Sequence, residues 1–313
     1  MMVVSREKQS FYDDLFLNFP NYLRPGDCLV LNNTRVFPAR LRGRRNTPSG
    51  AEIELLLVRA LDPDEKQWLV LAKPAKRVRK GDKLLFGLGL EATVQDQGEF
   101  GERTVTFHAD ERVRVILEQI GQIPLPPYIH RTPDFQDRER YQTVFSEKGG
   151  SAAAPTAGLH FTSEMLARCL SAGAAIAHVT LHVGLGTFAP LREQDLSRIQ
   201  LHEECFEISP ENAAIMRDAQ RLVCVGTTSV RTIETAMLRG GLEAASGETN
   251  LFIYPGFHFR GTGGLLTNFH LPQSSLLMLV CALGGKDLVM AAYNHAVQER
   301  YRFFSYGDCM LVL

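Results

Sequence analysis

The feature that most constrains the fold of this 313-residue chain is a change of pattern between its two halves. Short apolar runs occur at residues 53–58, 68–71, 83–86, 91–94 and 104–107, with Gly, Asp and Pro between them. Closely spaced short strands separated by turn residues are typical of a small antiparallel barrel or sandwich. Residues 111–120, which carry apolar side chains at helical spacing, then predict one helix.

After residue 150, strand-like and helical segments alternate, which indicates a mainly parallel sheet. Buried strands are expected at residues 28–33, 175–183, 222–225, 251–254, 265–269 and 309–313, and helix starts at Ser209 and Ser274. The predicted fold class is α/β: a mainly parallel-sheet α/β domain with an inserted small antiparallel β-barrel domain. Residues 1–40 and 129–313 would form the α/β domain, and residues 41–128 the barrel and its return helix.

Composition narrows the class of protein. No apolar run reaches the length of a membrane span, no hydrophobic signal segment precedes the first strand, and six dispersed cysteines indicate reduced thiols, so a cytoplasmic protein without membrane association is expected. The net charge of −1 gives no global attraction for a polyanion, but basic residues cluster in the first half of the chain. Such a cluster can bind phosphates, although a solvated surface is the alternative.

Four histidines stand beside Gly, Thr, Pro and Asn at the ends of apolar runs, where chains turn. They are His160, His182, His202 and His270. Imidazoles have pKa values near neutrality and suit proton transfer, and Glu203 beside His202 could polarise a base. The alternative for each is a satisfied core histidine, which we favour for His178.

Two strand ends could hold a polar ligand. The strand at residues 222–225 is followed by Gly226 and then by Thr227, Thr228 and Ser229, a form that presents backbone N–H groups to an anion, with Arg231 as a carboxylate clamp. An ordinary helix cap is the alternative. Asn32, Asn33 and Arg35 could bind a ligand or simply form a turn.

Close backbone approach to a ligand is also expected after His182, at Gly184, Gly186 and Thr187, although this segment is not a dinucleotide-binding fingerprint. A metal site is a weaker alternative, with ligands drawn from His178, His182, His202 and Glu203. No metal-binding signature is present in the sequence, so no metal is expected.

Several dense motifs occur in one order along about nine-tenths of the chain. They are NNTRV at 32–36 with PARL at 38–41, PLPPYI at 124–129, DRERYQTV at 137–144, AAPTAGLHF at 153–161, VTLHV at 179–183 with GTF at 186–188, VGTTSVR at 225–231, LTNFHLP at 266–272 and RYRFFSYGD at 300–308. Together they resemble the S-adenosylmethionine:tRNA ribosyltransferase-isomerases of queuosine biosynthesis.

The resemblance implies an enzyme that transfers and isomerises the ribosyl part of S-adenosylmethionine onto 7-aminomethyl-7-deazaguanine at the tRNA wobble position. Epoxyqueuosine-tRNA, adenine and methionine would be the products. It also implies an α/β domain with an inserted barrel. Members of the family begin with a longer segment, so the N-terminal part of this α/β domain is expected to be shortened; a monomer is the expected oligomeric state.

Site roles follow as hypotheses. His182, His160, His270 and Glu203 would be catalytic, while Thr227, Thr228, Ser229, Arg231, Gly184, Gly186 and Thr187 would bind S-adenosylmethionine. Contacts to tRNA are expected from Asn32, Asn33, Arg35, Arg40, Lys73, Lys76, Arg77, Arg138 and Tyr141. A non-catalytic RNA-binding protein and a metal hydrolase are the competing classes.

Overall fold

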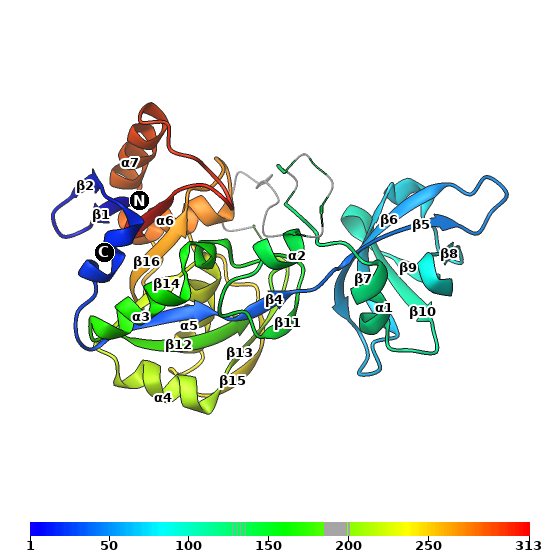
Figure 1. The fold of residues 1–313 in the computed structure, drawn as a ribbon, viewed down its shortest axis with the longest axis horizontal. Coiled ribbons are helices and arrows are strands. Elements are labelled where there is room, and N and C mark those ends of the chain that lie inside the picture. Colours follow the sequence, from blue (N-terminus) through cyan, green and yellow to red (C-terminus); the bar gives the residue numbers. More distant parts are fainter. Residues whose placement is uncertain (127, 130, 132, 135, 185–198, 200) are drawn as a thin grey trace. The chain divides into compact units, whose positions relative to one another are not determined.

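The computed structural model describes residues 1–126, 128–129, 131, 133–134, 136–184, 199 and 201–313. The chain forms two compact units (Figure 1). Residues 1–34, 142–148 and 154–313 make up the α/β unit, and residues 35–141 and 149–153 the barrel unit. The expected fold class is confirmed, whereas the domain boundaries expected at 40/41 and 128/129 stay a prediction.

A nine-stranded mixed sheet organises the α/β unit, in the order β15-β13-β12-β3-β14-β16-β17-β1-β2. Its strands are β1 (Met2–Ser5), β2 (Ser10–Asp13), β3 (Asp27–Asn32), β12 (Ala175–Leu181), β13 (Glu204–Ile208), β14 (Arg221–Val225), β15 (Ala245–Thr249), β16 (Thr262–Asn268) and β17 (Cys309–Val312). The four neighbours β12, β3, β14 and β16 run parallel to one another, as does the pair β1 and β17. The remaining neighbours are antiparallel.

The strand expected at residues 251–254 is wrong. This segment follows β15 without joining the sheet. The carbonyl oxygen of Leu251 accepts from Nε of Arg231, so a side chain occupies a backbone group that a strand would use for its ladder.

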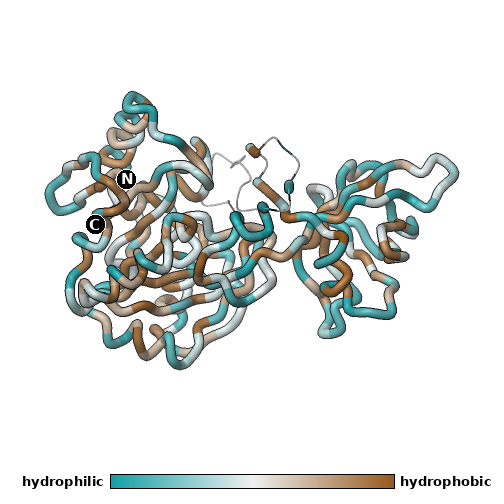
Figure 2. The backbone as a smooth tube through the Cα atoms, in the orientation of Figure 1, coloured by the Kyte–Doolittle hydropathy of each residue, from teal (hydrophilic) through white to brown (hydrophobic). Residues whose placement is uncertain are grey.

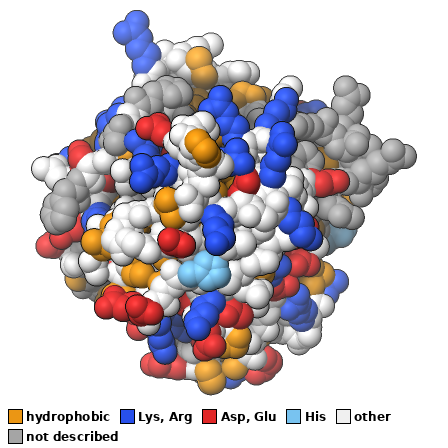
Figure 3. Space-filling view, turned by 90° about the vertical axis from the view of Figure 1, so that its right-hand side faces the viewer, with side chains coloured by type: hydrophobic (Ala, Val, Ile, Leu, Met, Phe, Trp, Pro, Cys, Tyr) orange, Lys and Arg blue, Asp and Glu red, His pale blue; other side chains and the backbone are white. Residues whose placement is uncertain are grey.

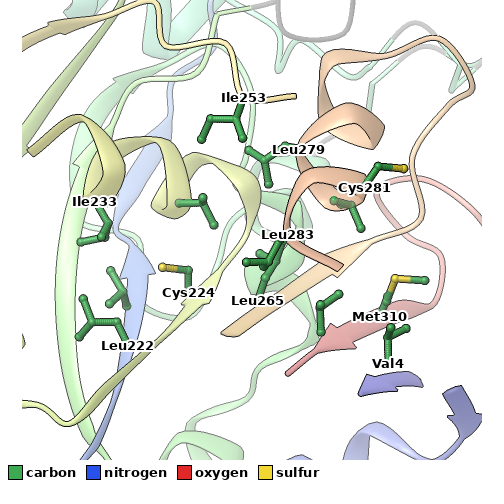
Figure 4. Close-up of a cluster of buried hydrophobic side chains, with 14 of the residues drawn as sticks. Val4, Leu222, Cys224, Ile233, Ile253, Leu265, Leu279, Cys281, Leu283 and Met310 are labelled. Carbon is green, nitrogen blue, oxygen red and sulfur yellow. The ribbon is translucent and has the colours of Figure 1, made fainter. Parts of the chain in front are cut away.

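Both faces of the sheet are covered, because successive apolar residues of a strand point to opposite sides. Cys28 and Val30 belong to one core, while Leu29 and Leu31 belong to the other. The covering helices are η1 (Phe16–Tyr22), η5 (Thr156–His160), α3 (Ser163–Ser171), α4 (Pro210–Asp218), α5 (Thr227–Leu238), α6 (Ser275–Gly284) and α7 (Lys286–Gln298). Figure 4 shows Leu265 of β16 beside Leu283 of α6 in the first core.

The helix starts are fixed by local hydrogen bonds. Ser209 and Ser274, both expected as caps, accept from the backbone N–H groups of Asn212 and Leu277. Thr162 accepts in the same way from Met165. Each cap satisfies one of the N–H groups that a helix leaves unpaired at its start.

The barrel unit contains a closed sheet in the order β10-β7-β6-β5-β8-β9. Its strands are β5 (Arg40–Arg45), β6 (Glu52–Ala60), β7 (Gln67–Lys73), β8 (Lys83–Leu85), β9 (Glu91–Gln97) and β10 (Glu102–His108), with η2 (Ala75–Arg77), η3 (Gly87–Gly89), η4 (Glu99–Gly101), α1 (Val113–Ile120) and α2 (Asp137–Arg140). A further two-stranded sheet pairs β4 (Thr34–Val36) with β11 (Lys148–Ser151). Figure 2 shows the hydrophobic stretches along the strands and the hydrophilic ones along hairpins and outer loops.

Among the described residues, no single helix combines the length and the apolar character that crossing a membrane requires. Helices α6 and α7 meet those criteria only when counted together, and they are bent by 117° at their junction.

Glu234 of α5 ties this helix to the start of β16. Its fully buried carboxylate accepts from the backbone N–H groups of Arg260, Gly261 and Thr262 and from the Thr262 hydroxyl. We expect Glu234→Ala to lower the free energy of unfolding by about 3 kcal/mol, because several buried donors lose their acceptor. Chemical denaturation followed by circular dichroism measures this. Glu243→Ala, which removes only an exposed pair with Arg217, should change it by less than about 0.5 kcal/mol; equal losses would contradict the role of Glu234.

Candidate active site at the carboxyl edge of the sheet

The candidate site lies where four parallel strands end. Because β12, β3, β14 and β16 run parallel, their carboxyl ends meet at one edge of the sheet, where α/β proteins bind ligands. The residues at or just after these ends are Asn32, Asn33, His182, Gly226, Thr227, Thr228, Asn268 and His270. Four of the sequence motifs, at residues 32–36, 179–183, 225–231 and 266–272, thus lie side by side along this edge of the sheet.

Asn32 cross-links three of these elements. Its side-chain amide, 1% exposed, donates to the Leu181 carbonyl and to the Thr228 hydroxyl and accepts from the Leu181 N–H. The neighbouring Asn33 accepts from the Thr180 hydroxyl and donates to Glu147. Both amides are used inside the protein, so they position the edge and are not free for direct tRNA contact in this structure.

His182 follows β12 and is only partly buried. Its Nδ1 lies 2.7 Å from the hydroxyl of Thr34, and its backbone N–H donates to the Cys205 carbonyl. With Thr34 accepting from Nδ1–H, the basic lone pair would be on Nε2, the arrangement that a general base needs. Thr34 was not predicted as a site residue, although it stands two residues from Asn32 in the same motif.

His160 is held at the other end of the row by Asn268. The Asn268 amide nitrogen lies 3.1 Å from Nε2 of His160, and it also donates to the Phe304 carbonyl. Its oxygen accepts from Thr156, so the orientation of this amide is fixed by three partners. Burial lowers the pKa of His160 to about 4, with the nearby Asp308 opposing the shift. His160 is therefore neutral near pH 7.

His270 stands two residues after Asn268, just beyond the end of β16. Its Nε2 lies 2.8 Å from the Thr267 hydroxyl, and its backbone N–H donates to the Tyr293 hydroxyl. Burial lowers the pKa of His270 to about 4 as well. The strand order separates the ends of β12 and β16 by three strand spacings, about 14 Å. The histidines thus line an edge that suits an extended ligand, instead of forming one compact cluster.

Between the two ends, α5 presents its N-terminus to the edge. Gly226 at its cap has a φ of 86°, a conformation that favours glycine, and no side chain caps the helix. The hydroxyls of Thr228 and Ser229 bond Asn32 and the Val225 carbonyl. The Thr227 hydroxyl, in a residue 6% exposed, has no partner among the residues that the structure describes. This helix start can accept an anionic ligand.

Arg231 and Glu204 form a buried ion pair behind this helix start. The two side chains are 5% and 3% exposed, and Arg231 also donates to the Leu251 and Thr249 carbonyls. The other oxygen of Glu204 accepts from the Gly184 N–H. Since its donors are directed to protein groups, Arg231 is not available here as the expected clamp for a ligand carboxylate.

Neighbouring residues of the His202-Glu203-Glu204 run differ in burial, and the catalytic role expected for Glu203 stays a prediction. Glu203 and His202 are exposed, whereas Glu204 is buried. The burial of Glu204 could have been predicted from the sequence. In a strand every second side chain points to the same face, so Glu204 faces the core together with Phe206 and Ile208. Gly186 and Thr187 lie outside the described residues.

The basic residues expected to contact tRNA belong mainly to the barrel unit. Lys73, Lys76 and Arg77 are exposed at the end of β7 and on η2, and within the described ranges they have no acidic partner. Figure 3 shows Lys and Arg side chains spread over one face, with acidic side chains between them.

Other expected tRNA contacts differ in accessibility. Arg35 is exposed, Arg40 pairs with Glu54, and Arg138 donates to two carbonyls at the end of α1, those of Glu118 and Gly121. Tyr141 is fully buried and offers no surface to a partner. No group of three metal-ligating side chains occurs among the residues that the structure covers, and the metal-free site stays a prediction.

Comparisons with known proteins agree over the full length. A family model described as "Queuosine biosynthesis protein" matches residues 1–312. The chain is 53% identical to an S-adenosylmethionine:tRNA ribosyltransferase-isomerase of Solibacter usitatus and 50% identical to one of Symbiobacterium thermophilum, covering all of this chain and 92% of each relative. A crystal structure of S-adenosylmethionine tRNA ribosyltransferase from Thermotoga maritima is 37% identical, with a TM-score of 0.55 over 100% of this chain and 91% of that one.

The lowered pKa values of His160 and His270 predict their titration. Their ring protons should shift in NMR spectra with midpoints near pH 4, while in urea-unfolded protein the midpoints should return to about 6.5. Because both pKa values are lowered on folding, their contribution to stability is complete above about pH 6.5 and is lost as the pH falls from 6.5 towards 4. Midpoints near 6.5 in the folded protein would contradict this environment.

Proposed function

This chain belongs to the queuosine biosynthesis protein family, and from that premise we propose that it is an S-adenosylmethionine:tRNA ribosyltransferase-isomerase. It transfers and isomerises the ribosyl part of S-adenosylmethionine onto 7-aminomethyl-7-deazaguanine at the tRNA wobble position, and it yields epoxyqueuosine-tRNA, adenine and methionine. The observation that carries the proposal is the full-length identity of about half to relatives with that enzyme name. The row of histidines at the sheet edge supports it.

The chemistry needs a base near the sulfonium and a donor near the departing adenine. A sulfonium acidifies the neighbouring 5′ C–H, and a positioned imidazole can remove that proton. We assign the base to His182, which follows the end of β12 and whose Nδ1 lies 2.7 Å from the Thr34 hydroxyl. His160, neutral and bonded at Nε2 by Asn268, offers Nδ1–H as a hydrogen-bond donor to the leaving group. His270, two residues after the end of β16, assists.

The methionine carboxylate fits the N-terminus of α5. Backbone N–H groups of Thr227, Thr228 and Ser229 start this helix without a side-chain cap, and the unpaired Thr227 hydroxyl adds a donor. Arg231 takes a different role from the expected clamp: together with Glu204 it holds the backbone at Gly184. Glu203, being exposed, is the weakest of the proposed catalytic residues.

The tRNA is proposed to bind through the exposed cations of the barrel unit, since phosphate contacts supply most of the sequence-independent affinity for nucleic acids. A tRNA substrate is consistent with a cytoplasmic protein. The monomer expected from the sequence stays a prediction.

Incubation with S-adenosylmethionine and precursor-modified tRNA should produce epoxyqueuosine, detected by nucleoside mass spectrometry, with adenine released in equal amount. His182→Ala and His160→Ala should each lower kcat by about 100-fold or more, because the first removes the proposed base and the second removes the hydrogen-bond donor to the leaving group. His258→Ala, at an exposed position away from the strand ends, is the control.

Binding of the tRNA without release of adenine would favour a non-catalytic RNA-binding protein. Near-normal turnover in both variants would refute the assignment of the histidines. A stoichiometric transition metal, found by elemental analysis of the purified protein, would refute the metal-free chemistry.

The barrel cations predict a salt-dependent defect. The double variant Lys76→Ala, Arg77→Ala should raise KM for tRNA by roughly 10-fold at physiological salt and reduce the slope of log affinity against log salt by up to about 2. The KM for S-adenosylmethionine should not change. Lys8→Ala, which removes an exposed cation from the α/β unit, is the matched control; equal effects of the two variants would contradict a specific barrel surface.

A further inference from the structure

The motif at residues 300–308 has no role in the function proposed above. It forms a tight turn that follows α7 and leads into β17. Two hydrogen bonds close its base: the Arg302 N–H donates to the Asp308 carboxylate, and the Asp308 N–H donates to the Arg302 carbonyl. Glycine is required at position 307, because a Cβ there would overlap the Arg302 carbonyl oxygen. The backbone of this turn is therefore tightly constrained.

Phe304, in the middle of the turn, has a strained backbone. Its φ of 73° lies in the left-handed region, which a large side chain adopts only at a cost in free energy. Such strain persists where the surrounding contacts outweigh it, and it is frequent at functional sites. Both backbone groups of Phe304 are directed to the end of β16. The N–H donates to the Phe269 carbonyl, and the carbonyl accepts from the side chain of Asn268.

The Phe304 carbonyl decides which way the Asn268 amide faces. This amide contacts three groups: the Thr156 hydroxyl, Nε2 of His160 and the Phe304 carbonyl oxygen. A hydroxyl can donate or accept, and a ring nitrogen of a neutral imidazole can do either, depending on the tautomer. A carbonyl oxygen can only accept, so the amide must turn its NH2 group towards Phe304. The second N–H of this group then serves His160, at an N···N distance of 3.1 Å.

The direction of the amide sets the tautomer of His160. Because Nε2 accepts from Asn268, it carries no proton, and in the neutral ring the proton is on Nδ1. If the amide were reversed, its oxygen would face the Phe304 carbonyl oxygen, and His160 would need its proton on Nε2. The Nδ1–H group, which is the proposed donor to the leaving group, would then be lost. The tautomer of His160 therefore depends on the position of the Phe304 carbonyl.

We propose that Phe304 is a positioning residue, whose left-handed backbone fixes His160 in the Nδ1–H tautomer through Asn268. This role rests on the proposed function, because it takes Nδ1–H to be the donor to the leaving adenine. The strain at Phe304 is then the consequence of placing its N–H and its carbonyl against the end of β16 at once.

Two substitutions by side chains of similar size separate the backbone of Phe304 from its ring. Asparagine tolerates the left-handed region, whereas the β-branched valine strongly disfavours it. Phe304→Val should therefore displace the carbonyl and lower kcat by about 10-fold or more, with KM for S-adenosylmethionine unchanged. Phe304→Asn should keep kcat within about 3-fold of the wild-type value. Thermal unfolding of each variant verifies that it is folded.

Nitrogen NMR of isotope-labelled protein near pH 7 reads the tautomer without any substrate, because protonated and unprotonated ring nitrogens differ in chemical shift. The His160 signals are those that disappear in His160→Ala. Wild type and Phe304→Asn should carry the proton on Nδ1, and Phe304→Val should show a mixture of both tautomers. The exposed His258 is the internal reference, whose signals should be the same in all variants.

Asn268→Asp tests the same link without altering the turn. A carboxylate can only accept, so Nε2 of His160 should become protonated and kcat should fall by about 10-fold or more.

The outcomes separate the positioning role from the function. Wild-type protein with the proton on Nε2, or Phe304→Val protein that keeps it on Nδ1, overturns the positioning role even if tRNA is modified normally. Equal losses of kcat in Phe304→Val and Phe304→Asn also overturn it, because they would assign the effect to the ring. The expected tautomers in a protein that forms no modified nucleoside support the positioning role and overturn the proposed function.

Discussion

The buried side chain of Asn32 is the interaction on which the candidate site depends. One amide joins the end of β3 to the backbone of Leu181 on β12 and to Thr228 at the start of α5. Three elements that are far apart in the sequence are thereby fixed in register at the edge where the ligand groups stand. If this buried amide lost one of these partners, polar groups would be left without hydrogen bonds. That free-energy cost disfavours any other arrangement of the three elements.

Around Asn32, the side chains that stabilise the fold differ from those proposed to react with the substrate. Buried pairs such as Glu204 with Arg231, and buried acceptors such as Glu234, satisfy backbone groups and hold loops. The histidines stay partly exposed, and each ring lies within hydrogen-bond distance of a neutral side chain: Thr34, Asn268 or Thr267. Neutral partners leave an imidazole uncharged, whereas a carboxylate partner would favour the imidazolium. Burial together with such partners keeps His160 and His270 neutral near pH 7.

Much of this could be predicted from the sequence, because central strands and helix caps leave strong local signals. The strands around Leu29, Val223 and Leu266 and the caps at Ser209 and Ser274 were predicted. Strand β5 was not, since its outward residues are arginines and only Leu41 is a large apolar residue. The partners Thr34 and Asn268 could not be found, because their roles arise from residues more than 100 positions away. The burial of Glu204 was not predicted, although it follows from the alternation of buried and exposed side chains along β13.

The position of β17 in the sheet has a consequence for the order in which the sheet can form. Strand β1 pairs in parallel with β17, with Met2 opposite Met310. Strand β17 in turn separates β1 from β16. The hairpin of β1 and β2 therefore has no place beside β16 until β17 has been made, and until then β16 keeps an unpaired edge. Because the contact that completes the sheet joins segments so far apart in the sequence, we expect it to form late in folding.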